Sequence, residues 1–440
     1  MSYEWIALLM FTSMMFLLAS GTRVFGAIGF VGSFFALMLW GEGAAEMPFN
    51  AAIGLMNWYP MLTLPMFIFM GYMFSEAGIA SELYRMFHVW FGPVRGGLAI
   101  GTIILMVAIS AMNGLSVAGM AIGSTIAMPE MLKRDYDKVM VTGVIQAGST
   151  LGIMIPPSVV LVLYGMIARQ PVGQLWMAGV FPGLLLAALF IAYIVIRCWI
   201  QPSLGPALPL VERQIGWMEK IKLLQAGVMP LLIIFSMTGL FLMGITSLVE
   251  SSAVGALAAT LVALIRGKLT RKVLENTLRQ SLSVSCMFMW VILAALCFSA
   301  VFDGLGAVNA IKFLFLDKWG LTPWGVLILM QFTYLIMGTF LDDTAMLIIV
   351  APLYIPLIIS LGFNPIWYGV LYTLTCQIAY ITPPFGYNLF LMRAMSPKEV
   401  TLVDIYRSII PFMLIMILGL VIIMMYPQIA LWLPEVYYAK

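Results

Sequence analysis

Two Pro-Pro pairs interrupt long apolar stretches of this sequence, at Pro156-Pro157 and at Pro383-Pro384. Proline has no backbone N–H, and the first proline of each pair also pushes the residue before it out of the helical conformation. The carbonyl groups near Gly152 and Ile155 therefore lose their helical partners. Such carbonyls, beside Ser, Thr and Asn oxygens, suit a hard, weakly held cation such as Na⁺, and adjacent half-helix N-termini suit a carboxylate. We predict that these breaks bind a cation and an anion.

A polar interruption precedes each break, inside an apolar run that is too long for one comfortable membrane crossing. The first run covers residues 98–129 and contains the polar stretch 110–116. The second run covers residues 322–357 and contains the polar stretch 338–344. Each run is either one long tilted helix or a re-entrant hairpin that has the polar stretch at its tip. Non-helical backbone at membrane depth is tolerated only where it is buried in protein or lines a cavity.

The composition indicates that the solvent around this chain is lipid. Of its 440 residues, 63% are apolar and only 9% are charged, whereas soluble domains have about 25% charged residues. A bilayer core of about 30 Å takes roughly 20 apolar residues per helical crossing. Apolar runs recur near residues 4–20, 24–40, 58–77, 98–129, 139–168, 176–196, 226–244, 247–265, 284–302, 322–357, 365–392 and 408–426. We predict an all-α polytopic membrane protein, with the first run as a retained span and not a cleaved signal.

The basic residues decide between the two interpretations of the long runs. If both are re-entrant hairpins, about ten full spans remain, and all but four of the 22 lysines and arginines fall on one side of the membrane. The four exceptions are Arg169, Lys312, Lys318 and Lys440. The positive-inside rule makes the rich side cytoplasmic. Through-going helices would instead place residues 213–222 and 266–279 opposite Arg95, so we predict about ten transmembrane helices plus two re-entrant hairpins.

An internal repeat organises the chain. Motifs around Pro129, Pro156 and Pro182 recur around Pro352, Pro383 and Pro411, so that Pro383 follows Pro156 by 227 residues. By the predicted topology the first half begins outside and the second begins inside, which makes the two halves inverted repeats. The predicted divisions are N-terminal scaffold helices (1–57), a first repeat (58–200), central scaffold helices with cytoplasmic loops (201–283), a second repeat (284–426) and a C-terminal tail (427–440). Within the repeats, residues 79–91 and 307–318 are predicted to form interfacial arm helices.

The sequence lacks the motifs of several other classes of protein. The four cysteines, Cys198, Cys286, Cys297 and Cys376, have no CxxC spacing, which argues against a disulfide framework or a zinc site. No GxxxxGK[ST] motif for ATP hydrolysis occurs. An intramembrane enzyme would need a nucleophile with a base, or metal ligands, within the bilayer, but the single histidine, His88, lies outside the predicted spans and no GxSxG motif is present. We therefore expect a transporter and not an enzyme, with no role for nucleic acid.

The residues at the breaks and tips resemble a known family. The matching motifs are Gly152–Ser158 with Tyr164-Gly165, Ala178–Gly183, Gly338–Asp342, and Ile381–Gly386 with Asn388–Phe390. Together they resemble the large membrane subunit (the M subunit, DctM-like) of tripartite ATP-independent periplasmic (TRAP) transporters, over essentially residues 58–426. The resemblance implies an elevator-type, sodium-coupled importer in the bacterial inner membrane. It also implies two partners, a small four-helix membrane subunit (the Q subunit) and a soluble periplasmic substrate-binding protein.

The resemblance also implies where ligands bind. In the family, one sodium ion lies between the first hairpin tip and the first broken helix, which carries over to Asn113, Leu115, Gly152, Ile155 and Pro157. The internal repeat then suggests a second sodium site at Gly338, Thr339, Ala379, Thr382 and Pro384. The family's first tip usually reads Gly-Ser-Ser, whereas here it is Gly114-Leu115-Ser116, so position 115 offers only its carbonyl.

Polar residues beside these sites are candidates for substrate binding. They are Ser116, Ser158, Asp342, Asp343 and Thr344. Acidic groups at membrane depth are functional candidates by default, although the two aspartates could equally cap the second arm of their hairpin.

The predicted function is secondary active import of a small organic anion, a carboxylate or sulfonate, driven by Na⁺ and without ATP. The alternative is a single-component divalent-anion:sodium symporter, which shares hairpins and inverted repeats but needs no small subunit. The sequence does not name the substrate, because no intramembrane arginine marks a carboxylate clamp. Sialic acid, C4-dicarboxylates, keto acids and sulfonates are all compatible with it.

Overall fold

The computed structural model describes residues 3–76, 78–114, 116–209, 216–339, 343–383 and 386–438. Every regular element that these residues form is a helix. Many large apolar side chains are exposed on the outer surface, among them Trp199, Leu231 and Phe332. Such a surface suits lipid and not water. These features confirm the predicted all-α, multi-span membrane protein.

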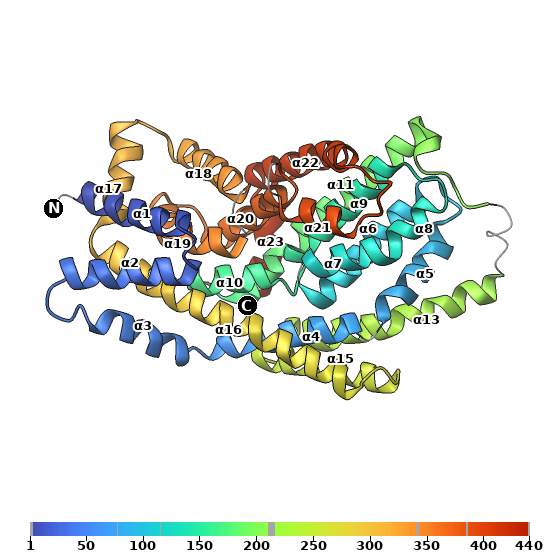
Figure 1. Cartoon of the computed structure of the whole chain (residues 1–440), viewed down its shortest axis with the longest axis horizontal. Coiled ribbons are helices and arrows are strands. Elements are labelled where there is room, and N and C mark those ends of the chain that lie inside the picture. The colour runs from blue at the N-terminus through green and yellow to red at the C-terminus, as the bar shows by residue number, and fades with distance from the viewer. Residues whose placement is uncertain are drawn as a thin grey trace.

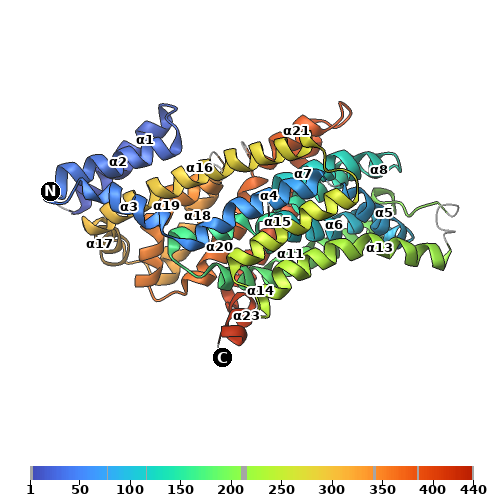
Figure 2. The ribbon, with the colours of Figure 1, turned by 90° about the horizontal axis from the view of Figure 1, so that it is seen from below.

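Helices from the N-terminal and central parts of the chain form one side of the molecule. They are α1 (Tyr3–Ala19), α2 (Val24–Leu39), α3 (Glu46–Met56), η1 (Tyr59–Leu62), α4 (Thr63–Glu76), α13 (Trp217–Ile234), η5 (Phe235–Gly239), α14 (Leu240–Leu242), α15 (Leu248–Ile265) and α16 (Arg271–Gly304). Helix α2 packs along α16, and α4 packs against both α15 and α16. Figure 2 shows α4, α15 and α16 running side by side.

Residues 79–91, which were predicted to form an interfacial arm helix, form α5 (Ile79–Phe91), and α5 packs against α6 and α13. That α5 lies along the membrane surface stays a prediction. An ion pair ties α5 to the end of α15. The Arg266 guanidinium donates from its two terminal nitrogens to the two oxygens of Glu82, each at 2.8 Å. Two parallel charge-assisted bonds fix an orientation as well as a distance, so α5 is held against the central helices.

The first long apolar run folds back on itself, as the hairpin interpretation predicts. Its first arm is α6 (Gly97–Asn113), and its second arm consists of α7 (Ser116–Ile122), the π-helical turn η2 (Gly123–Ala127) and α8 (Met128–Leu132). A methyl group on Gly123 would lie 2.6 Å from Cε of Met106 on the opposite arm. The two arms are therefore in direct contact on either side of a tip at Gly114.

A broken helix follows this hairpin. Helix α9 (Lys138–Thr150) continues into the 3₁₀ turn η3 (Leu151–Ile153), and α10 (Val159–Ala168) resumes after the prolines. Helix α11 (Val172–Ile200) then leads to the short turn η4 (Pro202–Leu204). From Met140 to Ala168 every residue is buried. In Figure 1, α10 lies in the middle of the molecule.

The second half repeats this order of elements. It contains α17 (Ala307–Phe313) with the π turn η6 (Leu314–Lys318), α18 (Pro323–Gly338), α19 (Asp343–Ser360), α20 (Pro365–Tyr380), α21 (Tyr387–Met395) and α22 (Leu402–Met425). Helices α18 and α19 pack against each other, and all of α20 from Ile366 onward is buried. The second hairpin and the second broken helix thus occupy the same places in the order as the first pair. That the two halves are inverted stays a prediction.

Five helices of the described residues are long and apolar enough to cross a membrane alone, namely α11, α13 with η5, α15, α16 and α22. Shorter apolar helices, including α1, α2, α6, α10 and α18, have 10–17 residues. The predicted total of about ten full spans stays a prediction.

Two segments differ from the divisions expected from hydropathy. The boundary placed between residues 283 and 284 falls inside α16, which begins at Arg271 because Thr270 caps it through a bond from the Val273 N–H (3.2 Å). The expected C-terminal tail forms α23 (Gln428–Tyr438), which packs against α11. Hydropathy reports where a helix meets lipid, not where the helix begins, so the charged first turns of α16 were left out of the expected span.

Candidate functional site

The first hairpin tip touches the first helix break. Gly114 adopts a left-handed conformation with φ +69°, and a methyl group on it would lie 2.1 Å from the carbonyl oxygen of Pro157. The Gly114 carbonyl in turn accepts a hydrogen bond from the Val159 N–H at 3.3 Å. Only glycine fits both the conformation and the close approach. The backbone at Gly114 is therefore held against the break at residues 157–159.

Ser158 forms hydrogen bonds to residues on both sides of this break. Its hydroxyl donates to the Ile153 carbonyl (2.5 Å) and accepts from the Leu161 N–H (3.1 Å), so it serves as the N-cap of α10. Its carbonyl accepts a bond from the Trp176 indole (3.3 Å). In a continuing helix the Ile153 carbonyl would pair with the amide of residue 157, which is a proline, and Ser158 replaces that missing donor. The corresponding partner for Gly152 would be Pro156, which also has no N–H.

Helix α11 packs directly against the break. A methyl group on Gly179 would lie 2.5 Å from the Met154 carbonyl oxygen, and one on Gly183 would lie 2.6 Å from Cγ1 of Ile155. Ile155 is 7% exposed, and Gly152 in η3 is buried. The broken backbone is thus buried in protein, as membrane depth requires.

The end of α18, which leads to the second tip, contacts α20 shortly before the second break. A methyl group on Gly338 would lie 2.3 Å from Cβ of Ala379, so the end of α18 is packed directly on α20. At the end of α20, the Thr382 hydroxyl donates to the Ile378 carbonyl at 2.6 Å. The Thr382 carbonyl accepts the Gly386 N–H at 3.0 Å, which turns the chain at this point.

A buried asparagine joins the first hairpin to the second broken helix. The Asn388 amide, on α21, donates to the Ser149 hydroxyl (3.0 Å) and the Gln146 carbonyl (3.4 Å) of α9. It also lies 3.3 Å from the hydroxyl of Ser116, the first residue of α7. Asn388 and Ser116 are 0% and 2% exposed. Buried polar groups with several partners specify one arrangement of the elements that carry them.

The two broken helices also contact each other directly, through residues 227 positions apart. The Gln377 side-chain amide of α20 donates to the Thr150 carbonyl of α9 at 2.7 Å. This separation is the same as that between the two Pro-Pro pairs. In addition, α7 packs against α21 and α10 packs against α19, so each hairpin contacts the broken helix of the other half. Reciprocal contacts of this kind are what a two-fold relation between the halves would produce.

Not every predicted site residue can be placed. Leu115, Asp342 and Pro384 lie outside the described residues, and only the backbone positions of Asn113, Asp343 and Thr344 are described. Thr339 ends α18, where its hydroxyl donates to the Ile336 carbonyl at 2.7 Å. The remaining predicted residues lie at the first break (Gly152, Ile155, Pro157 and Ser158), at the start of α7 (Ser116) and around the ends of α18 and α20 (Gly338, Ala379 and Thr382). Their roles stay predictions.

Gln146, Gln377 and Asn388 were missed as site residues by the sequence argument. The signal was available, because amide side chains are uncommon in such apolar runs and need hydrogen-bond partners there. The side-chain carbonyl oxygens of Gln146 and Gln377 are buried and have no hydrogen-bond partner among the described residues. Both oxygens can accept a donor or a cation. No group of three or more His, Cys, Asp or Glu side chains gathers as a metal site within the described parts of the chain.

A multi-span helical protein whose hairpin tips meet broken helices has the architecture of a secondary membrane transporter. The chain matches the family model "Tripartite ATP-independent periplasmic transporter, DctM component" over residues 11–429, and it belongs to that family. It is therefore a multi-pass permease component of a bacterial inner membrane, part of an ATP-independent, tripartite transporter. This confirms the predicted family and excludes the enzyme alternative.

Similar proteins agree with this assignment. The C4-dicarboxylate TRAP transporter large permease protein of Pseudomonas aeruginosa is 30% identical over 380 residues, which is 86% of each chain. The ectoine TRAP transporter large permease protein of Halomonas elongata is 26% identical and covers 91% of this chain and 92% of its own. Among solved structures, the YdaH transporter of Alcanivorax borkumensis superposes with a TM-score of 0.65 over 90% of each chain at 13% identity. That last likeness concerns the fold alone.

Proposed function

We propose that this permease imports a small organic anion by coupling it to an inward sodium gradient. The observation that carries this proposal is the contact of the first hairpin tip with the first helix break, at Gly114 with Pro157, together with the packing of the end of α18 on α20, at Gly338 with Ala379. At the first contact the Gly152 carbonyl faces Pro156 in place of a helical amide donor, and this backbone is buried. Carbonyl oxygens are suitable ligands for Na⁺, and the site needs no acidic cluster to hold a monovalent ion weakly.

The two contacts define two proposed sodium sites. The first uses carbonyls of Gly152, Ile155 and Pro157 together with the tip around Asn113 and Leu115. The second uses Gly338, Thr339, Ala379, Thr382 and Pro384. The substrate anion binds between them, near Ser116, Ser158 and the acidic tip at Asp342, Asp343 and Thr344, where half-helix N-termini supply positive partial charge.

The proposed mechanism is an elevator. The hairpins and broken helices, roughly residues 98–168 and 322–392, move as one body against the remaining helices. The network around Asn388 and the Gln377–Thr150 bond link the two halves of that body. The family description names a tripartite system, so we propose that a small four-helix membrane subunit assembles with the chain and that a periplasmic binding protein delivers the substrate.

Sodium replacement tests the proposed coupling. We expect uptake into proteoliposomes containing the assembled transporter and its binding protein to require an inward sodium gradient and to proceed without ATP. The physical reason is that the freed carbonyls have no other charge partner in these apolar segments. Equal uptake with K⁺ in place of Na⁺ on both sides of the membrane would contradict the proposal.

Omitting the partners tests the proposed assembly. We expect no substrate accumulation when either the binding protein or the small subunit is left out, because the described residues of this chain form no soluble receptor domain. Accumulation at the full rate by this chain alone would favour the single-component symporter.

The second sodium site can be tested at Thr382. Replacing Thr382 by valine removes one oxygen at nearly constant volume, and we expect about a tenfold weaker apparent sodium affinity because an interaction with a charged group is worth about 1.5–3 kcal/mol. Thr373→Val is a matched control on α20, the helix that ends just before Thr382, and the Thr373 hydroxyl likewise donates to the carbonyl four residues earlier (2.9 Å). Sodium dependence that changes equally in the two variants would show that the site is elsewhere.

A further inference from the structure

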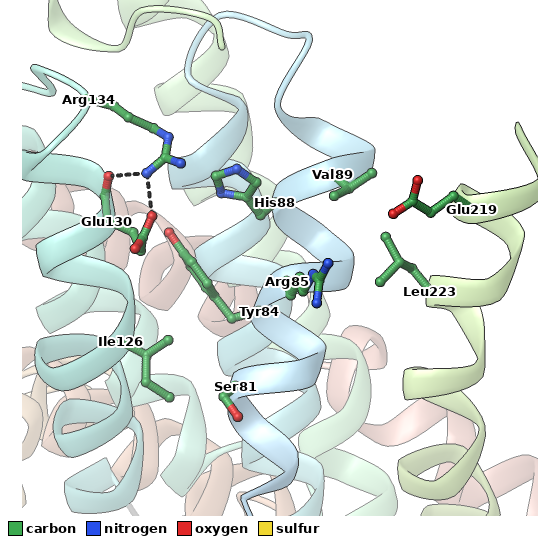
Figure 3. Close-up of a pocket in the computed structure, with 10 residues that line it drawn as sticks. All are labelled: Ser81, Tyr84, Arg85, His88, Val89, Ile126, Glu130, Arg134, Glu219 and Leu223. Atoms are coloured by element: carbon green, nitrogen blue, oxygen red, sulfur yellow. Dashed lines mark hydrogen bonds and ion pairs between the residues drawn. The ribbon is translucent and has the colours of Figure 1, made fainter. Parts of the chain in front are cut away.

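A cavity lies outside the region of the helix breaks. Its volume is about 480 Å³, and it is enclosed by the arm helix α5, the second arm of the first hairpin and α13 (Figure 3). Lys133 and Arg134, beside it, belong to the basic residues that place this end of the chain at the cytoplasmic face. The cavity is open on one side, and nothing in the proposed transport mechanism uses it.

The cavity walls carry charges of both signs. Arg134 forms an ion pair with Glu130 along the hairpin wall. On the other walls, Arg85 from α5 and Glu219 from α13 line the cavity, and neither makes an ion pair with any described residue. Figure 3 shows these two side chains on neighbouring helices. The cavity therefore presents one cation and one anion that remain available to a ligand.

Tyr84, which lines the cavity, carries a buried hydroxyl that makes no hydrogen bond to the described residues. The residue is 5% exposed. In Figure 3 its ring extends from α5 toward Glu130. An unsatisfied buried hydroxyl costs about 1–3 kcal/mol, and most such groups in folded proteins have a protein or solvent partner. A ligand oxygen in the cavity would provide one.

Ser81, His88 and three apolar side chains complete the lining, and the apolar part continues into the lipid-facing surface. Val89, Ile126 and Leu223 line the cavity, and α13 exposes Ile221 and Leu224 beside it. The Trp90 and Trp217 rings pack edge to face with centroids 6.4 Å apart next to this region. Tryptophan is enriched at the level of lipid headgroups. The polar cavity thus opens where a phospholipid would place its headgroup while its chains follow α13.

We propose that this cavity binds a phosphate ester carrying a primary amine, with the chemistry of a phosphoethanolamine headgroup. The phosphate accepts hydrogen bonds from Arg85 and from the Tyr84 hydroxyl, and the ammonium group donates to Glu219. A purely anionic headgroup would leave Glu219 facing like charge, and a choline headgroup has no N–H to donate. The apolar continuation of the cavity favours a membrane phospholipid over a soluble ester as the source.

Thermal stability of the purified, assembled transporter in detergent tests this proposal. Phosphatidylethanolamine is titrated against phosphatidylglycerol and phosphatidylcholine with identical acyl chains, and free O-phosphoethanolamine forms a separate arm. We expect the ethanolamine lipid to give the largest rise in Tm. A comparable rise with free O-phosphoethanolamine would support the same site and assign a soluble source, whereas equal responses to all three lipids would overturn the proposal.

Variants of the cavity residues test whether the rise in Tm with lipid arises from binding in this cavity. Arg85→Gln and Glu219→Gln should each raise the lipid concentration at half-effect about tenfold, since each removes a charge-assisted hydrogen bond. Tyr84→Phe, which removes only a hydroxyl, should raise it severalfold and provides a test if the charge variants fail to assemble. Lys222→Gln is the matched control, because Lys222 lies on α13 outside the cavity. Half-effect concentrations that are the same in Tyr84→Phe, Lys222→Gln and the unaltered protein would overturn the assignment.

Discussion

Replacing Gly114 by alanine is expected to lower sodium-driven uptake by about tenfold or more, since overpacking a well-packed interior costs about 1–3 kcal/mol. The added methyl group would lie 2.1 Å from the Pro157 carbonyl oxygen, and backbone on both sides prevents relief by a side-chain rotation. The tip would have to move away from the break. The measurement is initial uptake in proteoliposomes, normalised to correctly inserted protein.

Gly362→Ala is a control that separates the effect of the collision with Pro157 from the effect of a side chain at positive φ. Gly362 also has a left-handed conformation, with φ +81°, but no atom lies within 4 Å of the position that a methyl group would take. Both variants carry the cost of placing a side chain at positive φ, about 1 kcal/mol, and only Gly114→Ala adds the collision. Equal uptake by the two variants would show that contact between the tip and the break is not required for transport.

Replacing Asn388 by alanine is expected to reduce both stability and uptake. The change removes the amide that contacts Ser149, Ser116 and the Gln146 carbonyl. Leaving such buried groups without a partner costs about 1–3 kcal/mol. Because the network joins the first hairpin to the second broken helix, we expect a lower Tm together with loss of coupled uptake. The readouts are thermal unfolding of the purified complex and uptake at saturating sodium.

The matched control is Asn57→Ala, an exposed asparagine at the end of α3. It should leave both measurements unchanged. A variant of Asn388 that is less stable but transports normally would restrict the residue to a structural role and contradict its place at the site.

The helix breaks and hairpins could be predicted from the sequence because their causes are local. Proline lacks an N–H wherever it occurs, so Pro156-Pro157 had to interrupt a helix. The polar stretch around Gly114 likewise had to be a tip or a kink, and the distribution of basic residues selected the tip. These arguments did not require knowing which distant segments of the chain pack together.

The contacts across the molecule could not be predicted in this way. Nothing near Asn388 in the sequence indicates that its partners are Ser116 and Ser149, more than 200 residues earlier. Hydropathy also placed the start of a span at residue 284, whereas α16 extends back to Arg271. Charged residues can continue a helix into water, so a helix boundary and a membrane boundary need not coincide.

The bond from Gln377 to Thr150 joins two positions that correspond to each other in the predicted repeat. Its acceptor is a backbone carbonyl, which every amino acid carries, so the bond depends on the side chain at position 377 and not on the one at position 150. Another residue at 150 would keep the acceptor, whereas a threonine at 377 would be too short to replace the amide. One side chain therefore holds the two broken helices together at this point, and substitutions at the two corresponding positions should have unequal effects.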